Sequence, residues 1–422
     1  MVLACGSLPA QFDLQGTLLG DRIWSQRGQP ANIMEGTFGT FRYGGSIGGY
    51  LGNTHATLKG VFAENGYIEE ATKDRLVDAI RKREDVGAGY RLGLAAVNFM
   101  IGGQRVGVYV DDELSLYARF NAPGTLGLLL RGNGAYAGDT VRDAGIMAKM
   151  LRTRELSLGT GWKWGKLGLG VRLRLKQGIK MLHLADLNYS LYTSPPGTLI
   201  HAAGNYDLTA SPSLGKAGLF QFQGFGAGLD LGMRYALGEK VEIDAAITDL
   251  GMTFWKNCNR IQHSVNASWE GFSIGSLLQD SLSPQMQHLA DSIRGILLPD
   301  TVQASRTVYS PAVIRGNVTF HLPGTARLSG SVVYSPLAAG ARTRRPMIGV
   351  TYQQEVVKGL TLGANVYGMG LDSYGFGAMG AYRVAVGGAA LDVLLGSDNL
   401  AGLVAPALGR GMNLYAGIGV GF

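Results

Sequence analysis

The sequence has few cysteines, few charged residues and no long hydrophobic run. Only two of its 422 residues are cysteines, Cys5 and Cys258, which cannot form a disulfide framework or a paired-cysteine metal site. Charged residues make up 16% of the chain, against about 25% in typical soluble proteins. No window reaches the roughly 18 apolar residues that a membrane-spanning helix needs. These absences argue against both an ordinary soluble protein and a helical membrane protein.

Glycine is abundant instead, with 65 residues, and 46% of the chain is hydrophobic. The glycines fall mostly at every second position inside apolar stretches, which is the period of a β-strand. In the final segment, 412–422, apolar side chains hold one parity, and the other carries glycines together with Asn413 and Tyr415. The same alternation recurs in 167–176, 225–235, 312–320, 326–334 and 348–353. Such alternation is typical of transmembrane β-strands.

We therefore predict an all-β fold: a transmembrane antiparallel β-barrel of roughly 14 to 18 strands with short helical loop insertions. Residues 36–422 are expected to form the barrel. Two stretches, 68–83 and 277–298, are predicted to be helical insertions between strands and not membrane spans. The more polar segments 184–192 and 198–208 are joined by Pro195-Pro196-Gly197 and are predicted to form a hairpin that projects beyond the membrane.

Two further segments are expected before the barrel. Residues 1–10 are similar to the end of a secretory signal peptide, because small residues precede Gln11. Residues 11–35 are expected to be a periplasmic N-terminal segment or a plug in the lumen.

The most distinctive chemistry is a set of charges that share the strand parity assigned to the lumen. The candidate solute-contacting residues are Lys163, Arg172, Arg174, Lys176, Asp230, Arg234, Arg315, Arg327 and Arg383. One interpretation is that these charges pair with acids, Glu242, Asp244 and Asp392 among them, inside a wet barrel. The other is that the basic residues form a ladder that lowers the barrier for anions or anionic amphiphiles.

Aromatic residues near the ends of the predicted strands form a second pattern. Amphipathic rings favour the lipid-water interface, so we expect these side chains to form a girdle there. The set is Trp162, Trp164, Tyr235, Trp255, Trp269 and Tyr352.

Catalytic and cofactor motifs are weak. Ser46 and Ser273 each lie in a G-x-S-x-G pattern, but a nucleophilic serine needs a strand-turn-helix elbow, a histidine and an acid, and no such triad can be argued. The six histidines show no metal-ligand spacing, and no glycine-rich run opens a helix after a parallel strand. We therefore expect no metal, no cofactor and no nucleic-acid partner. We also expect no enzyme activity, and a barrel enzyme that uses Ser46 or Ser273 is the least favoured alternative.

Several runs together resemble a Bacteroidota-type family of conserved outer-membrane barrels of unknown function. They are GNGAYAG (132–138), RELSLGTGWKW (154–164), KLGLGVRLRLKQGI (166–179) and the tail segments SDNLAGL (397–403) and ALGRGMNLYAGIGVGF (407–422). The tail departs from the family pattern at Tyr415, where an arginine is expected. More coarsely, the chain is similar to fatty-acid-transporter barrels and to type 9 secretion partners of the PorV and PorP/SprF kind. The resemblance implies a fold and a location, but no activity.

The expected function is a pore or transporter for small anionic or amphipathic solutes, which pass through a basic lumen in the cell outer membrane. The alternative is a non-conducting accessory barrel of a type 9-like secretion or surface-assembly system. The expected partners are outer-membrane lipid, the barrel-assembly machinery through the C-terminal strand that ends in Phe422, and a secretion or surface-assembly complex.

Overall fold

The computed structural model describes residues 23–34, 41–53, 70–80, 84–120, 122–197, 199–212, 223–270, 301–336, 346–369, 374–400, 404 and 411–422. Residues 1–10, the predicted insertion 277–298 and Ser273 lie outside the described residues, as do residues 11–22 and 35 of the predicted N-terminal segment 11–35. The helical elements are η3 (Ile23–Arg27), η4 (Pro30–Met34), α2 (Glu70–Ile80), α3 (Pro123–Arg131) and η5 (Asn133–Tyr136). None of the helices in these ranges combines the length and the hydropathy that a membrane crossing requires.

In the described ranges, sixteen strands make up one antiparallel sheet. They are β1 (Phe41–Asn53), β2 (Glu84–Ile101), β3 (Gln104–Phe120), β4 (Thr140–Trp164), β5 (Leu167–Thr193), β6 (Leu199–Ala210), β7 (Gly224–Leu237), β8 (Val241–Glu270), β9 (Val302–Tyr309), β10 (Val313–His321), β11 (Arg327–Tyr334), β12 (Met347–Val357), β13 (Leu360–Met369), β14 (Tyr374–Val386), β15 (Ala389–Ser397) and β16 (Gly411–Gly421).

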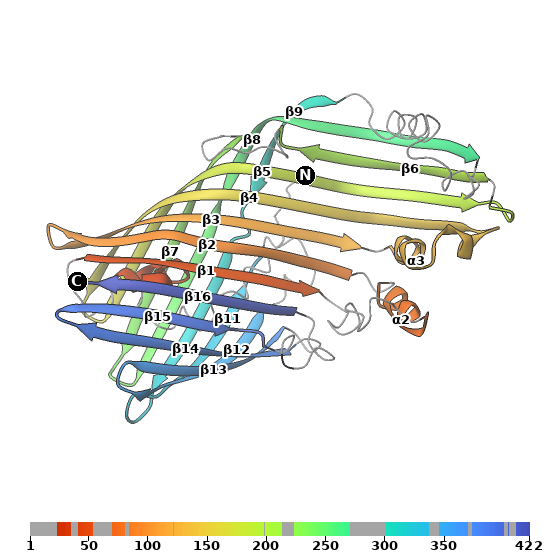
Figure 1. Cartoon of the computed structure of the whole chain (residues 1–422). Helices are drawn as coiled ribbons and strands as arrows, with labels where there is room; N and C mark the ends of the chain where they lie inside the picture. Colours follow the sequence, from red (N-terminus) through yellow and green to blue (C-terminus); the bar gives the residue numbers. More distant parts are fainter. Residues whose placement is uncertain are drawn as a thin grey trace.

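Fourteen of these strands close into a ring, which confirms the predicted barrel at the lower end of the expected strand number (Figure 1). The first and last strands pair with each other from Arg42↔Gly421 to Gly52↔Gly411. Strand β5 pairs with β7, and β8 pairs with β10, so β6 and β9 lie outside the ring. Closure leaves the ring without an unpaired edge, which a sheet in lipid requires because lipid offers no hydrogen-bond partners.

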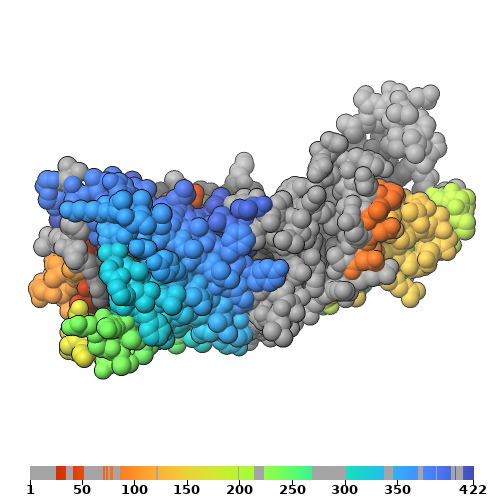
Figure 2. All heavy atoms as spheres, turned by 90° about the horizontal axis from the view of Figure 1, so that it is seen from below, coloured from red at the N-terminus to blue at the C-terminus, as the bar shows by residue number. Residues whose placement is uncertain are grey.

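Strands β4, β5 and β8 are 25, 27 and 30 residues long, and they continue past the ring. Within the ring, β7 lies between β5 and β8 and pairs with both. Beyond the ring, β6 takes this place and pairs with β5 from Leu182↔Ala210 to Thr193↔Ile200. This continuation, which we call the sheet extension, carries the predicted hairpin around Pro195-Pro196-Gly197. Figure 2 shows α2 and α3 (orange and yellow) at this end of the molecule.

Strand parity sorts the side chains as predicted. On β5, Leu173 and Leu175 are 59% and 53% exposed on the outside, whereas the intervening Arg172 and Arg174 are each 4% exposed. On β16, Leu414 and Ile418 face outward and Tyr415 faces inward. The outer wall is therefore mainly apolar, and the lumen is lined by polar, charged and small residues.

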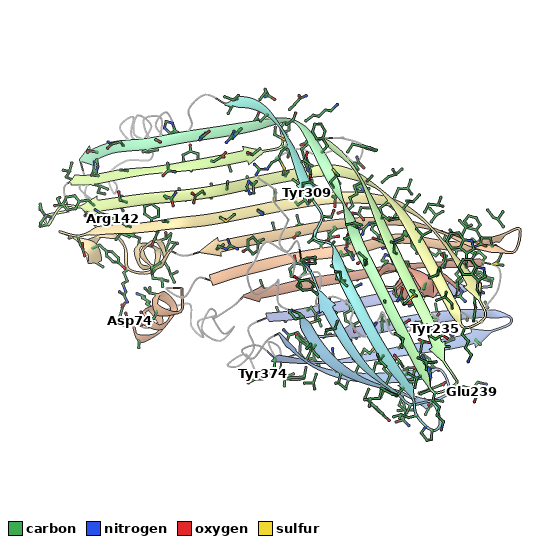
Figure 3. All side chains as sticks on the ribbon, turned by 180° about the vertical axis from the view of Figure 1, so that it is seen from behind. Asp74, Arg142, Tyr235, Glu239, Tyr309 and Tyr374 are labelled. Atoms are coloured by element: carbon green, nitrogen blue, oxygen red, sulfur yellow. The ribbon has the colours of Figure 1, made fainter. Side chains whose placement is uncertain are left out.

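The two ends of the barrel differ. At one end, which we call the turn end, tight turns join consecutive strands, and Phe422 lies there with its side chain exposed. The β2–β3 turn is Gly102-Gly103, with φ of 56° and 80°, a left-handed pair that glycine adopts without a steric penalty. The labelled Tyr235 and Glu239 mark this end in Figure 3, and Asp74 and Arg142 mark the other, the loop end.

The predicted aromatic girdle is partly wrong. Trp162, Trp164, Tyr235 and Tyr352 are exposed on the outer wall, as the prediction required. Trp255 is 0% exposed and packs against Met181, Cys258 and Val308 inside the sheet extension. Its parity places it on the inner face of β8, one residue from the exposed Phe254, and sequence spacing near a strand end does not reveal that face. The side chain of Trp269 lies outside the described part of the structure.

Helix α2 confirms the helical insertion expected within 68–83. It contacts α3 through Arg131 and Asp74. Helix α3 is fixed to the sheet extension by Asp143 of β4, whose carboxylate accepts hydrogen bonds from the Gly124 amide (3.1 Å) and the Thr125 hydroxyl (2.7 Å). A carboxylate at the first turn of a helix satisfies amides that have no partner within the helix.

Candidate functional site

The N-terminal segment Ser25–Ile33 lies inside the lumen, near the turn end. Helices η3 and η4 contact seven consecutive strands of the ring: β16, β1, β2, β3, β4, β5 and β7 (Figure 1). Every residue from Ser25 to Ile33 is buried. We call this segment the luminal segment.

Polar side chains of the barrel wall hold the luminal segment. The Arg27 Nε lies 2.7 Å from Oδ1 of Asp111 on β3, and both side chains are less than 10% exposed. Gln26 Oε1 accepts hydrogen bonds from Asn98 (2.8 Å) and Tyr109 (2.5 Å). Gln29 donates to the carbonyls of residues 233 and 245, each at 3.2 Å. These contacts tie the luminal segment to β2, β3, β7 and β8.

Two of the predicted basic residues also bind this segment. Arg172 donates to the carbonyl of Arg27 at 3.0 Å, and Arg315 donates to the carbonyl of Gly28 at 3.1 Å. Both residues therefore bind the backbone of the luminal segment, and Arg172 also contacts the Asp230 carboxylate.

Luminal glycines make room for the segment. A Cβ at Gly170 would lie 2.3 Å from the Pro30 carbonyl carbon, and a Cβ at Gly161 would lie 2.7 Å from Ile33 Cγ2. Gly232 is equally close, because its Cβ would meet the Ala31 amide nitrogen at 2.8 Å. Heavy atoms do not approach so closely, so η4 can occupy this position only where three strands present no side chain.

An ion-pair cluster crosses the lumen on the loop-end side of the luminal segment. Glu155 Oε2 lies 2.8 Å from Arg174 Nε, and its Oε1 lies 3.1 Å from Lys176 Nζ. Glu113 of β3 pairs with Arg91 of β2 at 2.7 Å. Asp249 of β8 joins both groups, because it contacts Arg174 and also Arg91, at 3.5 Å. Three carboxylates and three cations thus balance in this cluster.

Asp249 is held in an unusual backbone conformation. Its φ is 61°, in the left-handed region, at the point where β8 changes partner from β10 to β9. Its amide donates to Asp230 Oδ1 at 2.7 Å, and β7 has a register irregularity at Asp230. The local distortion aims the Asp249 carboxylate at Arg91, Arg174 and Lys176.

The structure gives most of the predicted site residues a carboxylate partner. Arg172 Nε and Arg174 Nη1 lie 2.6 Å and 3.3 Å from the carboxylate of Asp230, which is 0% exposed. Arg234 lies 2.7 Å from Asp244 and 3.1 Å from Glu242. Arg383 binds Asp392 through two nitrogens, at 2.7 and 2.9 Å.

Lys163 and Arg327 have the expected parity but lie exposed at the turn end. They lie at the turn-end termini of β4 and β11, where neighbouring strands no longer cover an inward side chain. The predicted luminal set therefore divides into paired residues in the lumen and exposed residues at its rim.

A small pocket lies on the loop-end side of the ion-pair cluster. Glu113, Glu155, Lys176 and Asp249 line its charged wall. Thr153, Thr253, Tyr309 and Ser310 add hydroxyl groups, and Ser310 Oγ lies 2.6 Å from Lys176 Nζ. Figure 3 shows the labelled Tyr309 between the two ends of the barrel.

Ser46 does not occupy a nucleophile elbow. It lies in the middle of β1, paired with Gly417 on one side and Gly93 on the other. Its hydroxyl oxygen accepts a hydrogen bond from Arg27 at 3.4 Å.

Several residues of the luminal contacts were missed from the sequence: Arg27, Arg91, Asp111, Glu113, Glu155 and Asp249. One signal was available, because Asp111-Asp112-Glu113 interrupts an otherwise apolar strand pattern. Consecutive acids in a membrane strand are costly unless cations face them, and this would have pointed to the paired arginines.

Two solved structures are similar to this chain over most of its length. A FadL homologue from Pseudomonas aeruginosa is 10% identical, with 96% of this chain and 94% of that chain covered and a TM-score of 0.42. The toluene transporter TbuX from Ralstonia pickettii is 9% identical, with 94% and 93% covered and a TM-score of 0.45. No curated protein matches the sequence. Residues 43–398 match a protein family described as a family of unknown function, DUF5723, so the chain belongs to that family.

Proposed function

We propose that this protein is an outer-membrane transporter for small solutes and that the luminal segment closes it. The observation that carries the proposal is the burial of Ser25–Ile33 within a ring of 14 strands, held mainly by polar contacts. Hydrogen bonds and ion pairs can exchange with water when a segment moves, whereas an interdigitated apolar core cannot do so without a large cost.

The outer wall supports an outer-membrane location. Outer-membrane barrels carry an outward apolar band bordered by aromatic residues, with short turns on the periplasmic side and longer loops outside. On β4 the outward side chains Leu156, Leu158, Trp162 and Trp164 are 39% to 59% exposed. We infer that the turn end is periplasmic and that the pocket at Tyr309 and Ser310 faces the exterior.

The class of solute is a separate part of the proposal. A preference for anionic or amphipathic solutes was predicted from the basic lumen and stays a prediction. Because Arg172, Arg174 and Arg234 have carboxylate partners, an anion would have to compete with Asp230 or Asp244 for them. The test replaces Arg172, Arg174 and Lys176 with glutamine. Unchanged ion selectivity and unchanged solute uptake in this variant would contradict a preference for anionic solutes.

The proposal is tested by conductance in a planar bilayer. The full chain is expected to give little current, and a variant that lacks 25–33 is expected to give steady current. The reversal potential in a salt gradient then reports the preference for anions or cations. A deletion variant that folds and inserts but stays silent would contradict a transport role.

A second candidate function is an accessory barrel of a secretion or surface-assembly system. The sheet extension favours it, because β4, β5, β6 and β8 run beyond the apolar band and carry α3 on a rigid attachment at Asp143. A platform of this kind suits a protein partner, as the PorV and PorP/SprF resemblance would imply. Stable co-purification with a larger complex, together with a silent deletion variant, would favour this function over transport.

A further inference from the structure

The outward face of β4 changes character along its length. From the turn end it carries Trp164, Trp162, Leu158 and Leu156, all exposed. The next two outward positions are Arg154 and Arg152. The strand thus presents aromatic rings at one border of the apolar band and guanidinium groups at the other.

The arginines are joined by charged and polar groups on the neighbouring strands. Asp112 of β3 is paired in register with Arg154, and Lys180 of β5 is paired with Arg152. Directly paired residues of an antiparallel ladder project to the same face, so all four lie on the outer wall. We call Arg152, Arg154, Lys180 and Asp112 the outer basic cluster.

Contacts within the outer basic cluster are well defined. Arg152 Nε and Nη2 lie 3.0 and 3.2 Å from the two oxygens of Asp112, and Arg154 Nη2 lies 3.2 Å from Oδ2. The Tyr90 hydroxyl donates to Asp112 at 3.1 Å. Asp112 is 2% exposed beneath these groups, whereas the Arg152 and Arg154 side chains are 33% and 20% exposed. One buried acid therefore orients two arginines, and the cluster keeps a net positive charge.

Strand β8 repeats the arrangement. Phe254 is 41% exposed on the outer wall, and Lys256 is the next outward residue, with Nζ 5.9 Å from the centre of the Phe254 ring. Basic side chains therefore border the apolar band on β4, β5 and β8.

We propose that the outer basic cluster binds phosphate groups of the outer-leaflet lipid, which in an outer membrane is lipopolysaccharide. This inference rests on the outer-membrane location and orientation of the proposed function, but not on transport. Guanidinium and ammonium groups attract phosphate oxygens, and basic residues beside an apolar surface attract anionic headgroups. The apolar strand face below the cluster would receive the acyl chains of the same lipid.

The test measures lipid A bound to the purified full chain in a neutral detergent, by native mass spectrometry. The probes are lipid A with both phosphates, the same lipid without phosphates, and inorganic phosphate. The unaltered chain is expected to retain the phosphorylated lipid and to lose the phosphate-free one. Equal retention of the two lipids overturns the inference. Displacement by inorganic phosphate at millimolar concentration assigns the site to free phosphate and overturns the lipid assignment.

Two variants make the test specific. Lys180→Gln removes one charge and is expected to weaken binding about fivefold. The triple variant Asp112→Asn, Arg152→Gln, Arg154→Gln removes both forks without leaving a buried carboxylate unpaired, and a loss of about tenfold or more is expected. Lys163→Gln makes the same charge change at the turn end and is expected to have no effect. Unchanged binding in both cluster variants contradicts the site.

The outcome is separable from that of the proposed function. A chain that inserts into phospholipid bilayers but binds both lipids equally refutes only the lipid site. A chain that does not insert at all refutes the membrane location, whatever its lipid binding.

Discussion

Arg91 on β2 reaches across the lumen to Asp249 on β8, with Nη2 and Oδ2 3.5 Å apart. Strands β3, β4, β5 and β7 stand between these two in the ring, so the contact bridges the lumen and does not follow the wall. Together with Arg174 and Glu155 it forms a charged layer between the luminal segment and the pocket. The luminal segment thus closes the lumen near the turn end, and the paired side chains narrow it on the loop-end side.

Removing the space beneath the luminal segment is expected to open the barrel. Gly170→Ala places a methyl group 2.3 Å from the Pro30 carbonyl carbon. Because backbone atoms cannot move aside without a large cost, we expect the luminal segment to be displaced from its position. We expect higher conductance and faster protease cleavage within 23–34. Gly168→Ala is the matched control, because its Cβ would lie 3.9 Å from the nearest atom. Equal behaviour of the two variants would show that the segment is not seated by Gly170.

Replacement of Asp249 is expected to destabilise the barrel through two separable effects. Asp249→Asn keeps a residue that tolerates the left-handed backbone but leaves Arg174 short of a carboxylate, and loss of one buried partner costs about 3 to 5 kcal/mol. Asp249→Ala adds a backbone penalty of about 1 to 2 kcal/mol.

Asn257 supplies the control for the backbone effect. Its φ is 54°, so Asn257→Ala is expected to cost only about 1 to 2 kcal/mol. The measurement is the urea midpoint of refolded protein in lipid. An Asp249→Asn variant as stable as the unaltered chain would mean that the ion-pair layer contributes little to the fold.

Helix α3 is expected to loosen without the Asp143 carboxylate. Asp143→Ala removes the acceptor for the Gly124 amide, the Thr125 hydroxyl and the Tyr189 hydroxyl. A lost helix cap costs about 0.5 to 2 kcal/mol. Hydrogen exchange of 123–131 should become several times faster. Arg142→Ala, at the exposed neighbouring position, should leave exchange unchanged, and protection that survives in both variants would refute the capping role.

Tyr189 is expected to titrate late. It lies on the sheet extension, beyond the apolar band, where burial and then the Asp143 carboxylate raise the pKa of Tyr189 from 10 to about 12. Because the folded state favours the protonated phenol, this stabilisation is present below pH 10 and is lost as the pH rises from 10 to 12. The measurement is a phenolate absorbance titration of the unaltered chain, from which the titration of Tyr189→Phe is subtracted. The difference should have a midpoint near pH 12, and a midpoint at pH 10 would show that Tyr189 is not buried beside Asp143.

The sequence by itself determined the barrel wall. Alternation such as Arg172, Leu173, Arg174, Leu175 assigns an inner and an outer face, because successive residues of a strand point to opposite sides whatever the rest of the chain does. The inward glycines and the polar hairpin at Pro195-Pro196-Gly197 could also be predicted, because strand parity and turn residues are local features of the sequence.

The tertiary structure decided what the inward residues do. Parity places Arg172 in the lumen, but only closure of the ring and the register of its strands bring Arg172 to Asp230 and to the carbonyl of Arg27. The absence of a side chain at Gly170 matters only because Pro30, from the start of the chain, packs against it in the lumen. Trp255 was misplaced for a related reason, since its face depends on the path of β8 into the sheet extension. Contacts between residues far apart in the chain depend on global geometry, which no local period encodes.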